Sequence, residues 1–313
     1  MKKKNARIPM KSGQTMHECF ERFLRFKSAQ GLKEITIKSY AANFHAISKY
    51  MNMDINIESI DKHFMDEAIV AMRKKGLSCH TIRSYTAAMK TFLSWCNEEE
   101  LTQVNIKLYR TEDTIKETYS DEELIRLLKK PNMRTCQFPE YRNWVIVNFL
   151  VDSGCRAATI RNIQNRDVDF QNSNVRFRHN KNKRMQIAPL SEAMKFILSE
   201  YMNIREGNPD DYLFPNQTGE QLTEVALASA IKRYNKKRGV NNLSIHCFRH
   251  TFARKYLLDC GGNAFTLQRL LGHSTLDMTK HYCAIFNADI VKDFDSYSPL
   301  TQMSKQPQRI IMR

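Results

Sequence analysis

Apolar side chains recur at intervals of three and four residues in four successive segments near the start of the chain, which is the spacing of one helix face. The segments cover residues 16–24, 37–50, 64–72 and 82–95. Glycine and polar residues interrupt the pattern between them, and Ser78 or Cys79 is placed to begin the fourth helix. We therefore predict a bundle of about four helices over residues 14–104, preceded by a flexible basic lead over residues 1–13.

The pattern changes in the remainder of the chain. Residues 105–118 are polar, with apolar positions too scattered for a helix face, and are predicted to be a linker. A helix is expected to follow, because Ser120 can cap its first turn and Glu123 completes a capping box. The apolar run at residues 144–151 predicts a buried helix, and helical spacing resumes after Ser191.

Three short segments between these helices have the composition of strands. They cover residues 167–170, 174–178 and 185–190, and a turn rich in lysine and asparagine at residues 179–184 would join the last two as a hairpin. The chain is therefore predicted to be mainly α-helical with one small β-sheet. The sheet belongs to a mixed α/β second domain over residues 119–296, which a tail over residues 297–313 follows. A length of 313 residues suits two domains that each bury a core.

Composition narrows the class of protein. The basic start of the chain has no apolar stretch behind it, so it is not a secretory signal, and no apolar run approaches the roughly 18–20 residues that a membrane span needs. We expect a cytoplasmic protein without a membrane partner. The eight cysteines form no C-x-x-C pair and no zinc-finger spacing, so we predict reduced thiols and no structural metal.

The charge of the chain points toward polyanions. Lysine and arginine number 49 against 33 aspartates and glutamates, a formal net charge of +16. Such a surplus favours nucleic acid first and an acidic membrane face second. Many basic proteins bind no DNA, however, so charge alone leaves the two interpretations equally weighted.

One short segment combines the residue types that bind and process phosphates. His246, Arg249 and His250 share one face of a helix, because they are spaced at i, i+3 and i+4. A guanidinium offers phosphate a bidentate fork, and imidazoles donate or accept protons near neutral pH. By itself, such a pattern is an ordinary surface cluster as often as it is a phosphate-binding site.

Two further segments add to it. Gly272 fits a helix end and His273 would open the next helix, where free N–H groups favour a bound phosphate; Tyr282 follows nine residues later. Upstream, Gly154 would end the buried apolar helix and place Arg156 at the start of another. A lone tyrosine or arginine in such positions is usually a packing or surface residue, so their meaning depends on the other residues.

In their order and spacing, these residues resemble the tyrosine recombinase (phage integrase) family, which includes Xer-type and mobile-element integrases. The matching residues are Gly154-Cys155-Arg156, Lys181 eight residues before Pro189, His246-x-x-Arg249, Leu271-Gly272-His273 and Tyr282. The match covers about residues 119–295. The N-terminal bundle is similar in length and position to the family's SAM-like core-binding domain.

The resemblance implies an enzyme that cuts and rejoins DNA. Tyr282 would attack a backbone phosphate to leave a 3′-phosphotyrosyl bond and a free 5′-hydroxyl, and a second strand would reverse the step through a Holliday junction. The covalent bond conserves the phosphodiester energy, so no cofactor is expected. Arg156 and Arg249 would stabilise the charge that builds on the phosphate, and His273 would hydrogen-bond a non-bridging oxygen.

Two proton transfers complete the implied reaction. His246 would act as general base toward the Tyr282 hydroxyl, whose ordinary pKa lies near 10. Lys181 would protonate the departing 5′-oxygen. Lys181 is flanked by asparagines where the family often has glycine, so Lys183 is a rival for this role. Cys155 replaces a bulky apolar residue of the family, which should alter packing only.

The resemblance also implies double-stranded DNA with specific core sites as substrate and a homotetramer on DNA, with accessory DNA-bending or excisionase proteins as further partners. Phosphate contacts, which set affinity more than sequence choice, are expected from basic residues of the bundle and the hairpin. These are Lys33, Lys38, Arg83, Lys90, Lys183 and Arg184. The alternative for the helical ones is a solvated helix face.

The stretch after about residue 287 resembles the short helix with which family members dock onto a neighbouring subunit, and its apolar residues are Phe294, Tyr297 and Leu300. The alternative is a helix packed on its own domain. The leading hypothesis for function is an integrase or transposase of a bacterial mobile element. Its alternatives are an Xer-type recombinase that resolves dimers, a catalytically silent DNA-binding protein on the same fold, and a type IB topoisomerase.

Overall fold

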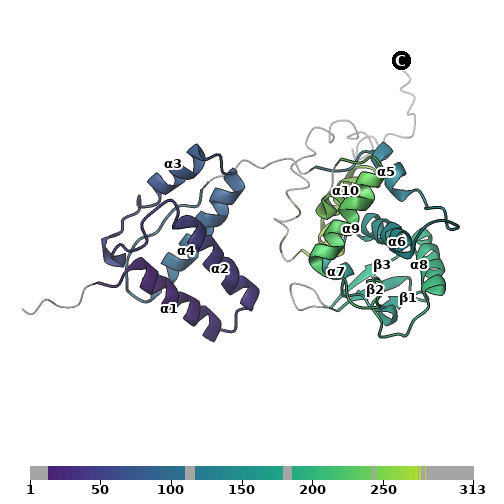
Figure 1. Ribbon diagram of the computed structural model, residues 1–313, viewed down its shortest axis with the longest axis horizontal. Coiled ribbons are helices and arrows are strands. Elements are labelled where there is room, and N and C mark those ends of the chain that lie inside the picture. Colours follow the sequence, from purple (N-terminus) through teal and green to yellow (C-terminus); the bar gives the residue numbers. More distant parts are fainter. Residues whose placement is uncertain are drawn as a thin grey trace, which may run out of the picture. The chain divides into compact units, whose positions relative to one another are not determined.

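The computed structural model describes residues 13–109, 117–178, 185–241, 244–273, 275 and 279. The chain forms two compact units, residues 1–113 and residues 114–313 (Figure 1). None of the helices in the described ranges combines the length and apolarity that a membrane crossing requires. Each unit has its own hydrophobic core.

The N-terminal unit contains the predicted helices. They are α1 (Met16–Ala29), α2 (Glu34–Ile47), α3 (Asp66–Lys74) and α4 (Cys79–Glu98), with a short 3₁₀ turn η1 (Ile57–Ser59) between α2 and α3. The Ser78 side chain accepts a hydrogen bond from the Thr81 amide, so Ser78 caps α4 and Cys79 is its first residue. At α1, Thr15 and Glu18 form a capping box.

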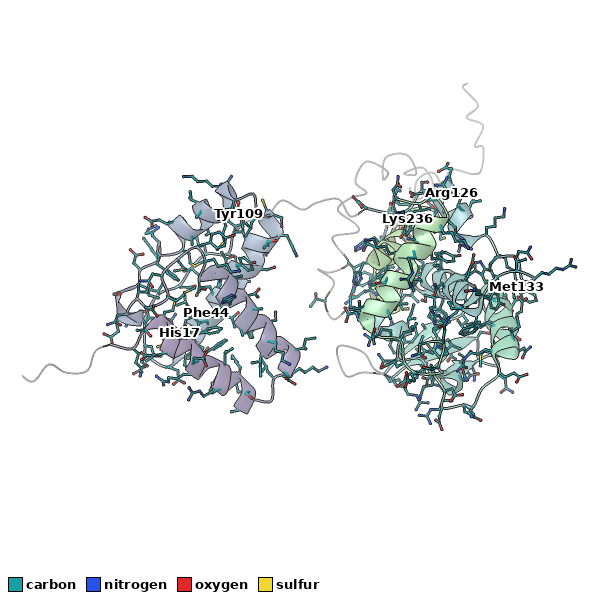
Figure 2. All side chains as sticks on the ribbon, viewed as in Figure 1. His17, Phe44, Tyr109, Arg126, Met133 and Lys236 are labelled. Carbon is teal, nitrogen blue, oxygen red and sulfur yellow. The ribbon has the colours of Figure 1, made fainter. Side chains whose placement is uncertain are left out.

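Aromatic rings fill the core of this unit. Phe20 of α1 stacks on Phe44 of α2 with ring centroids 3.7 Å apart, and Phe92 of α4 meets Phe20 edge-on at 5.4 Å. His17 lies beside Phe44, with ring centroids 6.1 Å apart (Figure 2). Trp95 packs against Phe92 in the same cluster. Three helices are therefore held together by a continuous set of ring contacts.

The second unit is helical around a small sheet, which confirms the predicted fold class. Its helices are α5 (Asp121–Leu128), α6 (Phe138–Ser153), α7 (Ala157–Ile160), α8 (Glu192–Arg205), α9 (Glu224–Lys237), α10 (Ile245–Leu258) and α11 (Ala264–Leu271). A 3₁₀ turn η2 (Asn165–Asp167) leads into strands β1 (Val168–Asp169), β2 (Asn174–Phe177) and β3 (Gln186–Pro189). The strands form an antiparallel sheet in the order β1-β2-β3. Val175 pairs with Ala188, and both side chains face the core.

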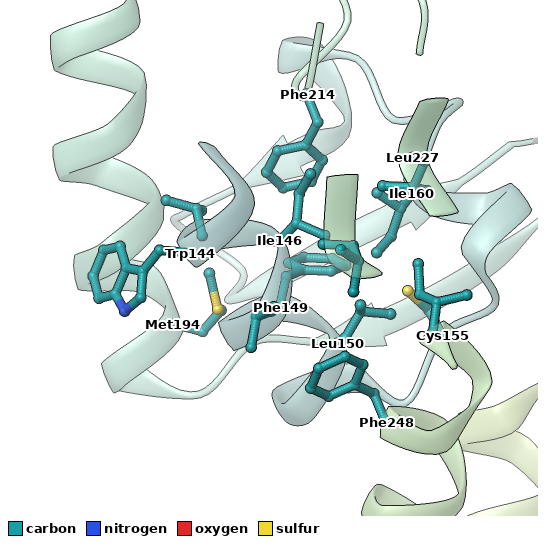
Figure 3. Close-up of a cluster of buried hydrophobic side chains, with 14 of the residues drawn as sticks. Trp144, Ile146, Phe149, Leu150, Cys155, Ile160, Met194, Phe214, Leu227 and Phe248 are labelled. Carbon is teal, nitrogen blue, oxygen red and sulfur yellow. The ribbon is translucent and has the colours of Figure 1, made fainter. Parts of the chain in front are cut away.

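Helix α6 is the centre of this unit. Ten of its 16 residues are buried, and it contacts α5, α8, α9 and α10. Figure 3 shows Phe149 and Leu150 of α6 among side chains of the surrounding elements. Because the helix is enclosed, its carboxyl end has a fixed position, and the site described next is built around that end.

Candidate active site

Arg249 lies on α10 with its side chain directed into the protein, and the residue is only 7% exposed. Its Nη1 donates to the carbonyl of Gly154 at 3.0 Å, and its Nη2 donates to the carbonyl of Leu271 at 2.9 Å. One guanidinium therefore joins the carboxyl ends of α6 and α11. The carbonyl oxygens partly offset the cost of burying this cation, and they fix the direction in which it points.

Gly154 permits this arrangement because of its backbone conformation. It caps α6 in the left-handed region with a φ of 58°. A Cβ at this position would lie 2.3 Å from the ring of Phe252 and 3.0 Å from Cδ2 of Leu271. Both the conformation and the close approach require glycine. The predicted helix end at Gly154 is confirmed, and it allows α10 and α11 to reach the end of α6.

His273 follows Gly272, which caps α11 with a φ of 62°. Its Nε2 lies 2.7 Å from Nη2 of Arg249, and its Nδ1 lies 2.9 Å from Oγ1 of Thr279. Burial and the positive charges of Arg249 and Arg156 together lower the pKa of His273 to about 4. The ring is therefore neutral at physiological pH.

Arg156 belongs to the same site. It is the N-cap of α7, it is half-buried, and its charge acts on His273. The preceding residue, Cys155, is buried near Leu150 and Phe248 (Figure 3). Burial raises the pKa of the Cys155 thiol to about 11, so this cysteine is an uncharged packing residue. The structure thus gathers two guanidiniums and a neutral imidazole at the end of α6.

The three residues of the predicted helix face differ in exposure. His246 is exposed in the first turn of α10, His250 is half-buried and Arg249 is buried. The spacing correctly places them on one side of a helix. The spacing does not show how deeply each residue is buried. This side of α10 passes from solvent into the core, and of the three side chains only that of His246 is exposed.

Two residues that the sequence did not single out connect to the site. Thr279, fully buried, contacts His273 as described above. Gln186, at the start of β3, donates from Nε2 to the Leu270 carbonyl at 2.7 Å. A Cβ on Gly272 would lie 2.4 Å from the Gln186 side-chain oxygen, so glycine is required here as well. No local pattern distinguishes either residue from other polar positions.

The described residues include only part of the predicted set. Lys181, Lys183, Arg184 and Tyr282 lie outside them, as do the apolar residues Phe294, Tyr297 and Leu300. Within the described part of the chain, no three histidine, cysteine, aspartate or glutamate side chains gather as a metal site would require.

The predicted DNA contacts of the N-terminal unit lie on two helices. Lys33 and Lys38 are exposed at the start of α2 and within it, and Lys38 pairs with Glu34 at 2.7 Å. Arg83 is exposed on α4 and donates to the Tyr109 carbonyl at 3.0 Å, whereas Lys90 is half-buried. These side chains therefore differ in how freely they can reach a ligand.

A buried, oriented arginine beside a second arginine and a neutral histidine has the donor groups and the charge that suit a phosphate ester. Comparison with known protein families identifies the family to which this chain belongs. The model of the phage integrase family matches residues 118–288, and that of the phage integrase N-terminal SAM-like domain matches residues 20–106. The chain belongs to the phage integrase family and is a tyrosine recombinase, an enzyme that cleaves and rejoins DNA.

Relatives and solved structures agree with this family. Tyrosine recombinase XerD of Staphylococcus haemolyticus is 26% identical over 297 residues, which cover 91% of this chain and 99% of that protein. The Tn1549 transposon integrase in complex with a circular intermediate DNA has a TM-score of 0.71 at 19% identity, covering 86% of this chain and 94% of that one. A lambda integrase tetramer bound to a Holliday junction has a TM-score of 0.70 at 16% identity, covering 87% of this chain and 78% of that one. The two structures show that the fold is shared.

Proposed function

We propose that this recombinase is catalytically active and that Tyr282 is its nucleophile. The observation that carries the proposal is the fixed guanidinium of Arg249, which two carbonyls hold beside His273 with the charge of Arg156 nearby. A protein that only binds DNA gains little from a buried arginine held in one direction. A phosphoryl-transfer enzyme needs such a group to meet charge that develops on the phosphate.

The proposed reaction exchanges one ester for another. His246, exposed at the start of α10, removes the proton of the Tyr282 hydroxyl as the tyrosine oxygen bonds to phosphorus. The bond between phosphorus and the 5′-oxygen breaks, and Lys181 protonates that oxygen, with Lys183 as the alternative donor. Arg156, Arg249 and His273 bind the phosphate oxygens. A 5′-hydroxyl of another strand then releases the tyrosine, so phosphodiester bonds are conserved.

We propose that Lys33, Lys38, Arg83 and Lys90 of the N-terminal unit contact DNA phosphates, together with Lys183 and Arg184. The first three of these side chains are exposed. Each phosphate that a lysine or arginine neutralises makes binding more sensitive to salt. The solved lambda integrase is a tetramer on a Holliday junction. By that analogy we propose a homotetramer on specific core sites, with the tail docked between subunits.

For the biological role we propose integration or transposition of a mobile element, with dimer resolution of the Xer type as the alternative. The similarity to XerD extends over 99% of that protein, which favours the alternative, but the sequence identity is only 26%. An identity of 26% is compatible with a shared architecture that acts on a different DNA site. The two roles can be distinguished with two sets of plasmids. One set carries the DNA ends of the mobile element and the other carries a dimer-resolution site, and the set that recombines identifies the role.

The test of the chemistry is a suicide substrate, a target duplex with a nick that lets the cleaved fragment diffuse away. Wild-type protein should form a covalent protein–DNA adduct on a denaturing gel, and Tyr282→Phe should form none. Lys181→Ala should reduce the adduct more than the neighbouring Lys183→Ala. An adduct that persists in Tyr282→Phe, or no adduct on a verified site, would overturn the proposal. Relaxation of supercoiled plasmid without a specific site would instead indicate a topoisomerase.

A further inference from the structure

We infer that Thr279 is a positioning residue, whose hydroxyl accepts a hydrogen bond from Nδ1 of His273 and thereby fixes the direction in which the ring meets the guanidinium of Arg249. The tautomer follows from the contacts of the site alone. The effect on catalysis rests on the proposed function.

One side of the His273 ring faces Arg249. Nε2 of His273 lies 2.7 Å from Nη2 of Arg249, which is hydrogen-bonding distance. A guanidinium has donors and no acceptor. Nε2 must therefore accept this hydrogen bond, and it carries no proton.

The other side of the His273 ring faces Thr279. In a neutral imidazole, one nitrogen carries the proton when the other does not. The proton therefore lies on Nδ1, which donates to Oγ1 of Thr279 at 2.9 Å. The opposite tautomer would turn an N–H group of the ring toward the N–H group of Arg249. A doubly protonated ring would do the same and add a second positive charge, which the lowered pKa of His273 disfavours.

Thr279 is suited to this role by its burial. Its side chain is fully enclosed, and a buried hydroxyl without a partner is costly, so the contact with His273 has a structural reason to persist. Thr279 also precedes Tyr282 by three positions, and three residues span about 11 Å at most. Two hydrogen bonds thus connect Arg249, through His273, to Thr279 and the part of the chain that leads to the proposed nucleophile.

These contacts give His273 one role in the protein without DNA and another when a phosphate is bound. An unprotonated Nε2 cannot donate to a phosphate oxygen, so in the free protein His273 orients Arg249 instead. An incoming phosphate brings negative charge, which favours protonation of Nε2. The Nδ1–H group can keep its hydrogen bond to Thr279 whether the ring is neutral or protonated. Thr279 therefore holds the ring in place while Nε2 changes its partner from Arg249 to a phosphate oxygen.

The tautomer can be measured directly in the full-length protein without DNA. In protein labelled with ¹⁵N-histidine, NMR shifts of the ring nitrogens report which one is protonated. His273→Gln identifies the His273 signals among those of the nine histidines. Wild type and Thr279→Ser, which keeps the hydroxyl, should show protonated Nδ1. Thr279→Val, which has nearly the same shape, should keep Nδ1 protonated but shift its signal, because the Nδ1–H group loses its hydrogen-bond acceptor.

A second readout follows the reaction on the nicked suicide substrate. Thr279→Val should lower the rate of adduct formation by about 10–100-fold, the usual range for residues that orient a functional group. Thr279→Ser should restore most of that rate, and DNA affinity should not change. Thr86→Val removes a fully buried hydroxyl from the other unit and is the matched control, for which neither readout should change.

The outcomes separate the two proposals. A His273 ring protonated on Nε2, or a Thr279→Val spectrum identical to wild type, would overturn the inference about Thr279. Equal adduct formation by wild type and Thr279→Val would overturn its role in positioning. A wild-type protein that shows the expected tautomer but never forms an adduct would instead contradict the proposed function.

Discussion

The core of the N-terminal unit is built from aromatic rings, whereas the core of the second unit also encloses polar and charged groups. Among the described residues, the buried polar side chains number one in the first unit, Thr86, and ten in the second. The ten include two arginines, Arg142 and Arg249, and both donate to backbone carbonyls.

The difference reflects what each core holds in place. Contacts between apolar side chains depend on area and shape and tolerate small displacements, whereas hydrogen bonds fix both distance and direction. Phosphoryl transfer requires its catalytic groups to be held to within about 0.5 Å. The second unit therefore uses a costly buried charge, Arg249, at the end of α6, and the first unit, which holds no such site among its described residues, does not.

The two tryptophans of the chain make this comparison measurable. Trp95 lies in the core of the first unit and Trp144 in the core of the second. Variants with a single tryptophan, Trp144→Phe or Trp95→Phe, allow urea unfolding of each unit to be followed by fluorescence in the full-length protein. The Trp95 transition reports the stability of the first unit, and the Trp144 transition reports that of the second.

The largest expected effect is the loss of a ring from the first core. Phe92 is fully buried and contacts Phe20, Phe23, Phe44 and Trp95. Phe92→Ala should lower the free energy of unfolding reported by Trp95 by about 3–5 kcal/mol, because it leaves a cavity. The transition reported by Trp144 should stay unchanged. A loss of less than 1 kcal/mol, or an equal loss in both transitions, would contradict the description of this core.

An intermediate effect is expected at the end of α6. Gly154→Ala should lower the stability reported by Trp144 by about 2–3 kcal/mol, since it combines a strained φ with a clash against Phe252. It should also slow adduct formation, because the Gly154 carbonyl binds Arg249. Gly239→Ala is the matched control. It has a φ of 66° and nothing within 4 Å of an added Cβ, so it should cost about 1 kcal/mol and leave adduct formation unchanged.

The smallest effect concerns pH. The pKa of His273 is lowered from 6.5 to about 4 in the folded protein, so the unfolded chain binds this proton more readily. The associated stability is present above pH 6.5 and is lost as the pH falls from 6.5 through 4. The loss should be on the order of 2 kcal/mol in the Trp144 transition, allowing for partial exposure. His273→Gln should remove this part of the pH dependence, and an identical pH slope in both proteins would refute it.

Much of this organisation could be predicted from the sequence because it depends on local signals. The caps at Ser78, Ser120 and Gly154, the helical spacing and the three short strands all lie where the pattern predicts them. These features require only neighbouring residues to agree. The family resemblance was carried by motifs that are likewise short and ordered along the chain.

The parts that could not be predicted depend on contacts between distant segments. The spacing of His246 and Arg249 gives a shared helix face, but it does not show that Arg249 is buried against the end of α6. Gln186 lies about 80 residues before the carbonyls that it binds, and no pattern near it indicates the contact. Thr279 is one of several hydroxyl residues near Tyr282, and only the position of the His273 ring distinguishes it.

The most direct test of the account is to identify the side chain that becomes bonded to DNA. Protein trapped on the nicked duplex is digested with nuclease and trypsin, and the modified peptide is identified by mass spectrometry. Trypsin cuts after Lys280 and Lys292, so the expected peptide, residues 281–292, contains a single tyrosine, Tyr282. The proposed nucleophilic role of Tyr282 predicts a nucleotide 3′-phosphate on this residue. A nucleotide on any other side chain would contradict it.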